Sequence, residues 1–122
     1  MSATGAWTFR LPTAVTFGNG CVGELARVCA AWGQRPLVAT DRGLAGLPLM
    51  DRVRDVLPGV PVFCDVDPDP TVASVDALAA VLRDGRRDVV VAVGGGSAMD
   101  CAKAAAALAA GTLPSIRAVH SE

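Results

Sequence analysis

The sequence predicts an α/β protein with a doubly wound, mostly parallel sheet and helices on both of its faces. Stretches with strand character and stretches with helical spacing alternate along the 122 residues, a length that suits one domain. The strand-like runs at 36–40 and 88–93 are continuously apolar, as in strands that are buried on both faces. Right-handed crossovers between successive parallel strands then place helices on both sides of the sheet, which is a Rossmann-like arrangement.

The first part of the chain is expected to hold two short strands and a helix. Residues 7–10 and 13–17 have the pattern of a short strand pair around Pro12. A helix is predicted over 21–32, and Gly33 is expected to end it. Its buried face is predicted from residues at helical spacing: Val22, Leu25, Ala26, Cys29 and Trp32.

The middle of the chain is expected to continue the alternation. The run at 36–40 is predicted to be a buried strand that ends beside Asp41. A second helix is predicted over 45–57, and a strand over 60–66 follows it.

The last part of the chain holds the clearest elements. Asp69 is predicted to be the N-cap of a helix that has Pro70 at its first position and runs to Gly85. The most apolar strand follows at 88–93, and a helix rich in small residues follows at 98–110. Residues 116–119 have strand character without a firm assignment.

Composition and charge exclude several classes of protein. Hydrophobic residues make up 52% of the chain, so a disordered protein is excluded. The net charge is −1 and the basic residues are scattered, which argues against a nucleic-acid or membrane-surface partner. No leader pattern and no apolar run of about 18 residues is seen, so a cytoplasmic location is expected.

The cysteines and the histidine do not form a metal-binding pattern. The four cysteines lack C-x-x-C spacing and are predicted to be core residues: Cys21, Cys29, Cys64 and Cys101. The single histidine is His120, whereas a catalytic metal site normally needs three protein ligands. We therefore predict no metal site and no catalytic residue in this chain.

Polar and glycine-rich segments follow three of the predicted strands. They are Asp41, residues 67–71 and residues 94–97. In open parallel sheets, ligands bind beyond the carboxyl ends of the strands. We therefore expect these segments to converge on one ligand site.

Two glycine loops compete for the role of phosphate cradle. Gly18, Gly20 and Gly23 match G-x-G-x-x-G, and Asp41 lies 18 positions after Gly23, where the dinucleotide fingerprint has an acid. The other loop, residues 94–96, follows the most apolar strand but lacks the third fingerprint glycine. Three consecutive glycines are costly in entropy and favour close approach of a ligand to the backbone at a helix N-terminus. From the residues alone, both loops remain open as turns or as phosphate sites.

Asp100 has a structural and a functional interpretation. Ser97 and Asp100 have the spacing of a capping box, and Lys103 lies three residues further on, within reach of a local ion pair. An acid beside phosphates is unfavourable, but it is tolerated if its side chain points towards the sugar or nicotinamide end of a cofactor.

Four segments, in this order and spacing, resemble a known family. The segments are residues 17–20, residues 39–41, residues 67–71, and residues 94–103 with the pattern G-G-G-S-x-x-D-x-A-K. Together they resemble the N-terminal domain of iron-containing (group III) alcohol dehydrogenases over about residues 7–110. The resemblance implies that the loop at 94–97 and its helix bind the pyrophosphate of NAD, and that the F-G-x-G segment is a structural entry to the first helix.

The resemblance assigns individual roles to the matching positions. Gly94, Gly95, Gly96 and Ser97 occupy the places that hold the pyrophosphate, and Asp100 the place of an acid beside the cofactor. Asp41 occupies the place of the aspartate that holds the adenosine ribose hydroxyls and favours NAD. The family usually has P-N-P-T where this chain has Pro68-Asp69-Pro70-Thr71, so the asparagine contact is not expected at Asp69.

The resemblance also implies that parts of the family's enzymes are not in this sequence. The family continues into a T-T-x-G-T-G-S-E loop and a helical domain that carries an aspartate and three histidines as metal ligands, which residues 112–122 do not match. Residues 1–122 are thus expected to be a truncated NAD-binding N-terminal domain, about a third of an enzyme that needs iron or another divalent metal.

Three interpretations of function follow from the resemblance. The first is the NAD(H)-binding part of an enzyme that acts on a small alcohol or aldehyde, inactive as a fragment and expected to self-associate. The second is a non-catalytic remnant that binds no nucleotide. The third is a relative of glycerol dehydrogenase or maleylacetate reductase, and the acid at Asp100 argues against the latter.

Overall fold

The computed structural model describes residue 6, residues 14–69 and residues 71–111. Its core is a parallel three-stranded sheet in the order β2-β1-β3, formed by Pro36–Ala39 (β1), Val62–Phe63 (β2) and Val89–Ala92 (β3). Central strand β1 pairs Val38 with Val62 of β2 and with Val91 of β3. The predicted parallel α/β sheet is confirmed.

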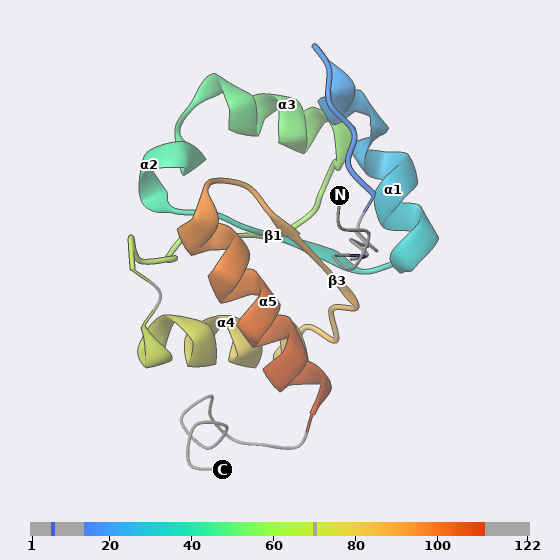
Figure 1. Cartoon of the computed structure of the whole chain (residues 1–122). Coiled ribbons are helices and arrows are strands. Elements are labelled where there is room, and N and C mark those ends of the chain that lie inside the picture. Colours follow the sequence, from blue (N-terminus) through green and yellow to red (C-terminus); the bar gives the residue numbers. More distant parts are fainter. Residues whose placement is uncertain (1–5, 7–13, 70, 112–122) are drawn as a thin grey trace.

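Helices cover both faces of this sheet, as predicted (Figure 1). Leu25–Trp32 (α1) and Pro48–Val56 (α3) lie on one face, and Val72–Asp84 (α4) and Gly96–Ala110 (α5) lie on the other. Alternation along β1 explains the two layers, because successive strand side chains point to opposite faces. Leu37 and Ala39 belong to the core cluster with α4 and α5, whereas Val38 belongs to the cluster with α1 and α3.

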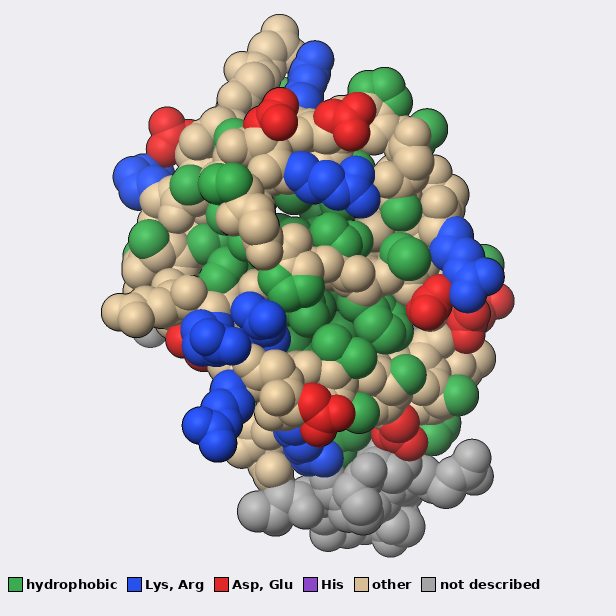
Figure 2. Space-filling view, turned by 180° about the vertical axis from the view of Figure 1, so that it is seen from behind, with side chains coloured by type: hydrophobic (Ala, Val, Ile, Leu, Met, Phe, Trp, Pro, Cys, Tyr) green, Lys and Arg blue, Asp and Glu red, His purple; other side chains and the backbone are tan. Residues whose placement is uncertain are grey.

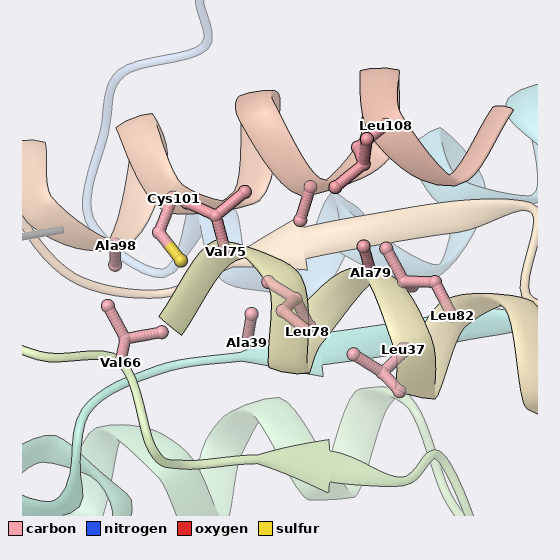
Figure 3. Packing of buried hydrophobic residues seen from close by; sticks show 11 residues of the cluster. Leu37, Ala39, Val66, Val75, Leu78, Ala79, Leu82, Ala98, Cys101 and Leu108 are labelled. Carbon is pink, nitrogen blue, oxygen red and sulfur yellow. The ribbon is translucent and has the colours of Figure 1, made fainter. Parts of the chain in front are cut away.

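The layer of α4 and α5 contains the larger core (Figure 3). Leu78 and Leu82 of α4, Cys101 and Leu108 of α5, and Leu37 of β1 belong to this cluster. Small residues on α5, such as Ala98 and Ala105, are almost fully buried and allow α4 to pack closely. The small-residue composition of α5 is therefore explained by packing.

The cysteine predictions are confirmed for two of the four residues. Cys29 and Cys101 are buried, and burial raises the pKa of each thiol. Cys21 and Cys64 are only partly buried, so the prediction that they are core residues was wrong. All four cysteines are free.

Several predicted elements differ from the structure near the N-terminus. Residues 14–17 form no strand, and Phe17 is fully exposed, because no strand of the described sheet pairs with them. The predicted strand at 7–10 lies outside the described residues. The predicted helix at 21–32 is a 3₁₀ turn, Cys21–Glu24 (η2), followed by α1, and Trp32 is 78% exposed rather than buried.

The predicted helix at 45–57 is confirmed as α3, which is shorter and spans Pro48–Val56, and a separate short helix precedes it. Arg42–Ala45 (α2) is a single turn, and α3 begins at Pro48 in its first position after an extended Leu47. Proline disfavours a helical conformation in the residue before it, so a helix cannot easily continue through Leu47 into Pro48. The predicted strand at 60–66 is reduced to the two residues of β2, and residues 116–119 lie outside the described residues.

The sheet surface is incompletely covered. All four residues of β3 are only half-buried, because β3 pairs with β1 on one side and with no described strand on the other. Figure 2 shows hydrophobic side chains in the middle of one face of the molecule, with charged side chains around them. Within the described ranges, no helix is long and apolar enough to cross a membrane.

Candidate functional site

A cavity of about 640 Å³ opens at the carboxyl edge of the sheet. It lies beyond β1 and β2 and beside the N-terminus of α5, where open parallel sheets place their ligands. All three segments that the sequence placed at this edge contribute to its lining, together with residues next to them. The lining residues are Asp41, Arg42, Gly43, Cys64, Asp65, Val66, Asp67, Pro68, Gly95, Ser97 and Ala98.

Thr40 holds this edge together. Its backbone N–H donates to Phe63 O at 2.8 Å, and its Oγ1 donates to Val93 O at 2.8 Å. Its own carbonyl oxygen accepts from the N–H of Val66 at 3.3 Å. Thr40 is fully buried, so its hydroxyl is satisfied within the protein and is not offered to a ligand. Sequence reasoning missed this residue, although a threonine at the end of an apolar strand is a recognisable signal.

The three glycines of residues 94–96 have different roles. Gly94 has φ +145°, and a side chain there would lie 3.1 Å from both Ala98 Cβ and Leu44 Cδ1, so this position needs glycine for the fold itself. Gly95, the N-cap of α5, has φ −90°, and a Cβ there would meet nothing within 4 Å. Gly96, the first residue of α5, is equally open. The conformation of this chain does not require glycine at 95 or 96.

The N-terminus of α5 therefore presents open backbone beside the cavity. α5 has 15 residues, and no side chain caps its N-terminus. Free N–H groups and the positive end of the helix dipole attract anions at such a position. Gly95 lines the cavity, whereas Gly94 and Gly96 are adjacent to it without being part of its lining.

Ser97 lines the cavity but does not act as a cap. The predicted capping box was wrong, because Ser97 lies inside α5, one residue after its start, and Gly95 is the N-cap. Its Oγ donates to the carbonyl oxygen of Pro68, which links α5 to the loop after β2. A ligand could accept a hydrogen bond from the Ser97 hydroxyl only if the bond to Pro68 were broken.

The loop after β2 is fixed by Asp67. Its carboxylate accepts from Ser74 Oγ at 2.6 Å and from Thr71 Oγ1 at 3.2 Å. Thr71 is the N-cap of α4 and accepts from the N–H of Ser74 at 3.0 Å. The prediction that Asp69 caps this helix was thus wrong: the helix begins two residues later than expected, and a threonine hydroxyl reaches its first turn.

Asp41 also lines the cavity. It is half-buried and is the N-cap of α2, where its Oδ1 accepts from the N–H of Leu44 at 2.8 Å. That hydrogen bond fixes the carboxylate in a cavity whose lining also includes Gly95 and Ser97. The structure thus brings together three of the predicted site residues.

Asp100 is not brought to the cavity. It is exposed on α5, one turn after Gly96, and does not belong to the cavity lining. Lys103 is also exposed, and the ion pair expected between these two side chains is not formed in the described structure.

The rival glycine loop lies elsewhere. Gly18, Gly20 and Gly23 surround the entry to η2, and Gly20 has φ +73° as its N-cap. None of the three belongs to the lining of the cavity. Their geometry matches the prediction that the F-G-x-G segment is a structural entry to the first helix.

Charges in the cavity are mainly acidic. Asp41, Asp65 and Asp67 line it together with a single cation, Arg42. Arg42 Nε and Nη2 each lie 2.7 Å from Asp65 Oδ1, and this pairing raises the pKa of Arg42. Sequence reasoning missed the pair, because the two residues are far apart in the chain and neither belongs to a motif.

The described residues do not fit a metal ion. No three His, Cys, Asp or Glu side chains come together in a way that could hold one, as judged over residues 14–69 and 71–111. His120 lies outside the described residues, so the prediction that the chain has no metal site stays a prediction.

Comparison with known families gives one match over most of the chain. The family model described as iron-containing alcohol dehydrogenase matches residues 12–120. Alcohol dehydrogenase 4 of Schizosaccharomyces pombe is 36% identical over 106 residues, covering 83% of this chain and 25% of that protein. The 1-propanol dehydrogenase PduQ of Citrobacter freundii is 37% identical over 100 residues, covering 80% and 26%. The chain thus spans about a quarter of the length of these relatives.

Solved structures show the same architecture. Sulfoacetaldehyde reductase from Bifidobacterium kashiwanohense, in complex with NAD+, superposes with a TM-score of 0.83 at 32% identity, covering 93% of this chain and 31% of that one. NADH-dependent butanol dehydrogenase A from Thermotoga maritima superposes with a TM-score of 0.77 at 26% identity, covering 91% and 29%.

Proposed function

The chain belongs to the iron-containing alcohol dehydrogenase family, and from this we propose that residues 1–122 form the NAD-binding N-terminal domain of such an enzyme. In this proposal the N-terminus of α5 holds the pyrophosphate of NAD(H), and Asp41 accepts hydrogen bonds from the adenosine ribose hydroxyls. Asp100 lies one turn further along α5, outside the cavity lining, and is assigned to the sugar or nicotinamide end of the cofactor.

One observation carries the proposal. Gly95 and Gly96 sit at the start of a long helix, without a positive φ and without a protein neighbour that would require glycine. Their lack of side chains is explained if a ligand approaches the backbone there. Pyrophosphate suits the site, because it accepts several N–H donors and is attracted by the helix dipole, which offsets the repulsion from the three aspartates. The relative solved in complex with NAD+ supports the choice of ligand.

The chain's own contribution to catalysis would be binding and orientation. A full-length enzyme would transfer hydride between a small alcohol or aldehyde and the nicotinamide, and a metal would polarise the alcohol oxygen. Since the described residues do not fit a metal, we assign no step of that reaction to this chain. A cytoplasmic location remains part of the proposal.

NADH titration of the folded 122-residue chain tests the proposal. We expect saturable binding with a Kd of about 0.1–1 mM, equivalent to about −5.5 to −4.1 kcal/mol, because only one wall of a dinucleotide cleft is present in the cavity. Calorimetry or NADH fluorescence measures the binding, and circular dichroism of the same sample establishes the fold. A folded chain that shows no saturation at several millimolar NADH would favour the remnant interpretation.

A pair of glycine variants links the binding to the site. Gly95→Ala should weaken NADH binding by about tenfold, or about 1.4 kcal/mol, because a methyl group would occupy the approach of the pyrophosphate. Gly46→Ala is the matched control, since Gly46 is also open to solvent but ends α2 outside the cavity lining. Equal affinities in the two variants would contradict the placement of the pyrophosphate at Gly95.

A further inference from the structure

The ion pair between Arg42 and Asp65 has a position that its stability does not explain. Both side chains are largely exposed, at 81% and 55%, and such surface pairs contribute little to folding. Both residues nevertheless line the cavity, and Arg42 directly follows Asp41 in the chain. Arg42 is also the single cation among the described residues that line the cavity.

The Asp65 carboxylate occupies two hydrogen-bond donors of the Arg42 guanidinium. Nε and Nη2 of Arg42 converge on one carboxylate oxygen of Asp65, each at 2.7 Å. This edge of the guanidinium is the one that commonly forms paired hydrogen bonds to phosphate. While Asp65 holds it, the same donors are unavailable to a ligand.

We propose that Asp65 is a specificity-determining residue that withholds Arg42 from a 2′-phosphate. The inference rests on the proposed function, which places the adenosine ribose beside Asp41. NADP differs from NAD by a 2′-phosphate, which carries a charge of about −1.5 to −2 at neutral pH. Asp41 repels that group directly, and Asp65 neutralises the one nearby cation that could bind it. The chain therefore contains a latent 2′-phosphate site that the Asp65 carboxylate keeps closed.

Removal of the Asp65 charge should open this site. In Asp65→Asn, we expect the ratio of the Kd for NADPH to the Kd for NADH to fall about tenfold, because only NADPH carries the phosphate that the freed guanidinium would bind, whereas any effect on pyrophosphate binding is common to both nucleotides. Calorimetric titration at low ionic strength, where screening is weak, measures both constants. The double variant Arg42→Gln/Asp65→Asn should lose this gain, because the phosphate would have no guanidinium to bind.

The control variant is Asp51→Asn. Asp51 forms an ion pair with Arg54 on α3, with 3.8 Å between Asp51 Oδ1 and Arg54 Nη1, and neither residue lines the cavity. This variant removes one negative charge and frees one arginine, as Asp65→Asn does. We expect the ratio of the two constants to stay within about twofold of the unmodified chain.

The outcomes separate this inference from the proposed function. If the folded chain binds neither nucleotide, both fail. If it binds NADH but Asp65→Asn leaves the ratio unchanged, only the role of Asp65 is overturned. That role is also overturned if Asp51→Asn lowers the ratio equally, or if the gain persists without Arg42, because the effect would then be one of net charge.

Discussion

At the residue scale, Asp41 combines a structural hydrogen bond with a place in the cavity. Its Oδ1 accepts from the N–H of Leu44, and Asp41 lines the same cavity as Gly95. The sequence led us to expect the ligand contact, and the structure adds the helix cap. If a mutation of Asp41 weakens cofactor binding, the loss could come from the helix cap or from the ligand contact, so the two roles must be tested separately.

Asp41→Asn separates the two roles. Asparagine caps helices as well as aspartate does, so unfolding free energy should change by less than about 0.5 kcal/mol. The preference for NAD over NADP should narrow, because a neutral amide no longer repels the 2′-phosphate. Competition titrations with NADH and NADPH measure the preference. Asp41→Gly should narrow it in the same way, since replacing a cap by glycine costs only a few tenths of a kcal/mol. Unchanged relative affinities in both variants would leave Asp41 with the capping role alone.

Thr40 is expected to be important for stability at the same edge. In Thr40→Val the shape of the side chain is kept, but Val93 O loses the hydroxyl donor that lies at 2.8 Å. An unsatisfied buried acceptor costs about 1–3 kcal/mol, so chemical denaturation should show a loss in that range. Thr40→Ser, which retains the hydroxyl, is the control and should lose less. If the valine variant were as stable as the unmodified chain, the hydrogen bond would not hold the cavity edge.

At the element scale, chemical and periodic signals each placed some features correctly and others not: the cap expected at Asp69 lies at Thr71, and part of the predicted buried face of α1 is exposed. Gly46 ends α2, and Pro48 begins α3 after an extended Leu47. The pattern on α1 correctly placed Cys29 in the core, but it also placed Trp32 there, which is 78% exposed. Helical periodicity cannot tell where the neighbouring element ends, and so it overestimates the length of a buried face.

Asp88 joins the elements at the opposite edge of the sheet. Its carboxylate accepts from the N–H of Gln34 at 3.1 Å and of Arg35 at 2.7 Å, which ties the start of β3 to the turn before β1. These two backbone hydrogen bonds hold the pKa of Asp88 below its ordinary value of 3.8. A lowered pKa in the folded state stabilises the protein above the unfolded pKa, and this contribution is lost as the pH falls through the folded value.

Asp88→Ala should therefore have a pH-dependent effect. We expect the variant to be less stable than the unmodified chain at pH 7, and the difference to shrink as the pH is lowered below about 4. Denaturant titrations at several pH values measure both chains. Asp55→Ala removes an exposed carboxylate on α3 and is the control. A destabilisation that stayed constant down to about pH 2.5 would show that Asp88 acts by packing instead of by its charge.

At the scale of the whole molecule, β3 lies at one edge of the sheet that residues 14–69 and 71–111 form. That strand has no described neighbour on its outer edge, and exposed apolar residues such as Trp32 on α1 and Met99 on α5 lie on the helices that flank the sheet. Open strand edges and apolar patches favour association with other chains. The self-association expected from the sequence therefore stays a prediction with a structural basis.

The 122-residue chain should have no alcohol dehydrogenase activity of its own. The described residues bring no three metal ligands together, and His120 is the only histidine in the sequence. A single wall of the cleft also cannot position an alcohol against the nicotinamide, and positioning alone contributes about 7–11 kcal/mol to barrier lowering. The purified chain, loaded with iron or zinc under reducing conditions, should form no NADH from simple alcohols, as followed by absorbance at 340 nm. Metal-dependent turnover that co-purifies with the monomeric chain would contradict this expectation.

The sequence by itself determined the class of fold, the order of strands and helices along the chain, and the edge of the sheet at which the candidate site lies. Apolar runs that alternate with helical segments predict buried parallel strands, and the carboxyl ends of such strands meet at one edge, so Asp41, Gly95 and Ser97 were expected to converge. Only the tertiary structure decided what each of these groups does there. Gly94 needs glycine for the fold whereas Gly95 does not, Ser97 donates to Pro68, and Arg42 is held by Asp65. The physical reason is that hydrogen-bond partners and open space depend on atoms that lie up to 54 residues apart in the chain, and no local pattern encodes those distances.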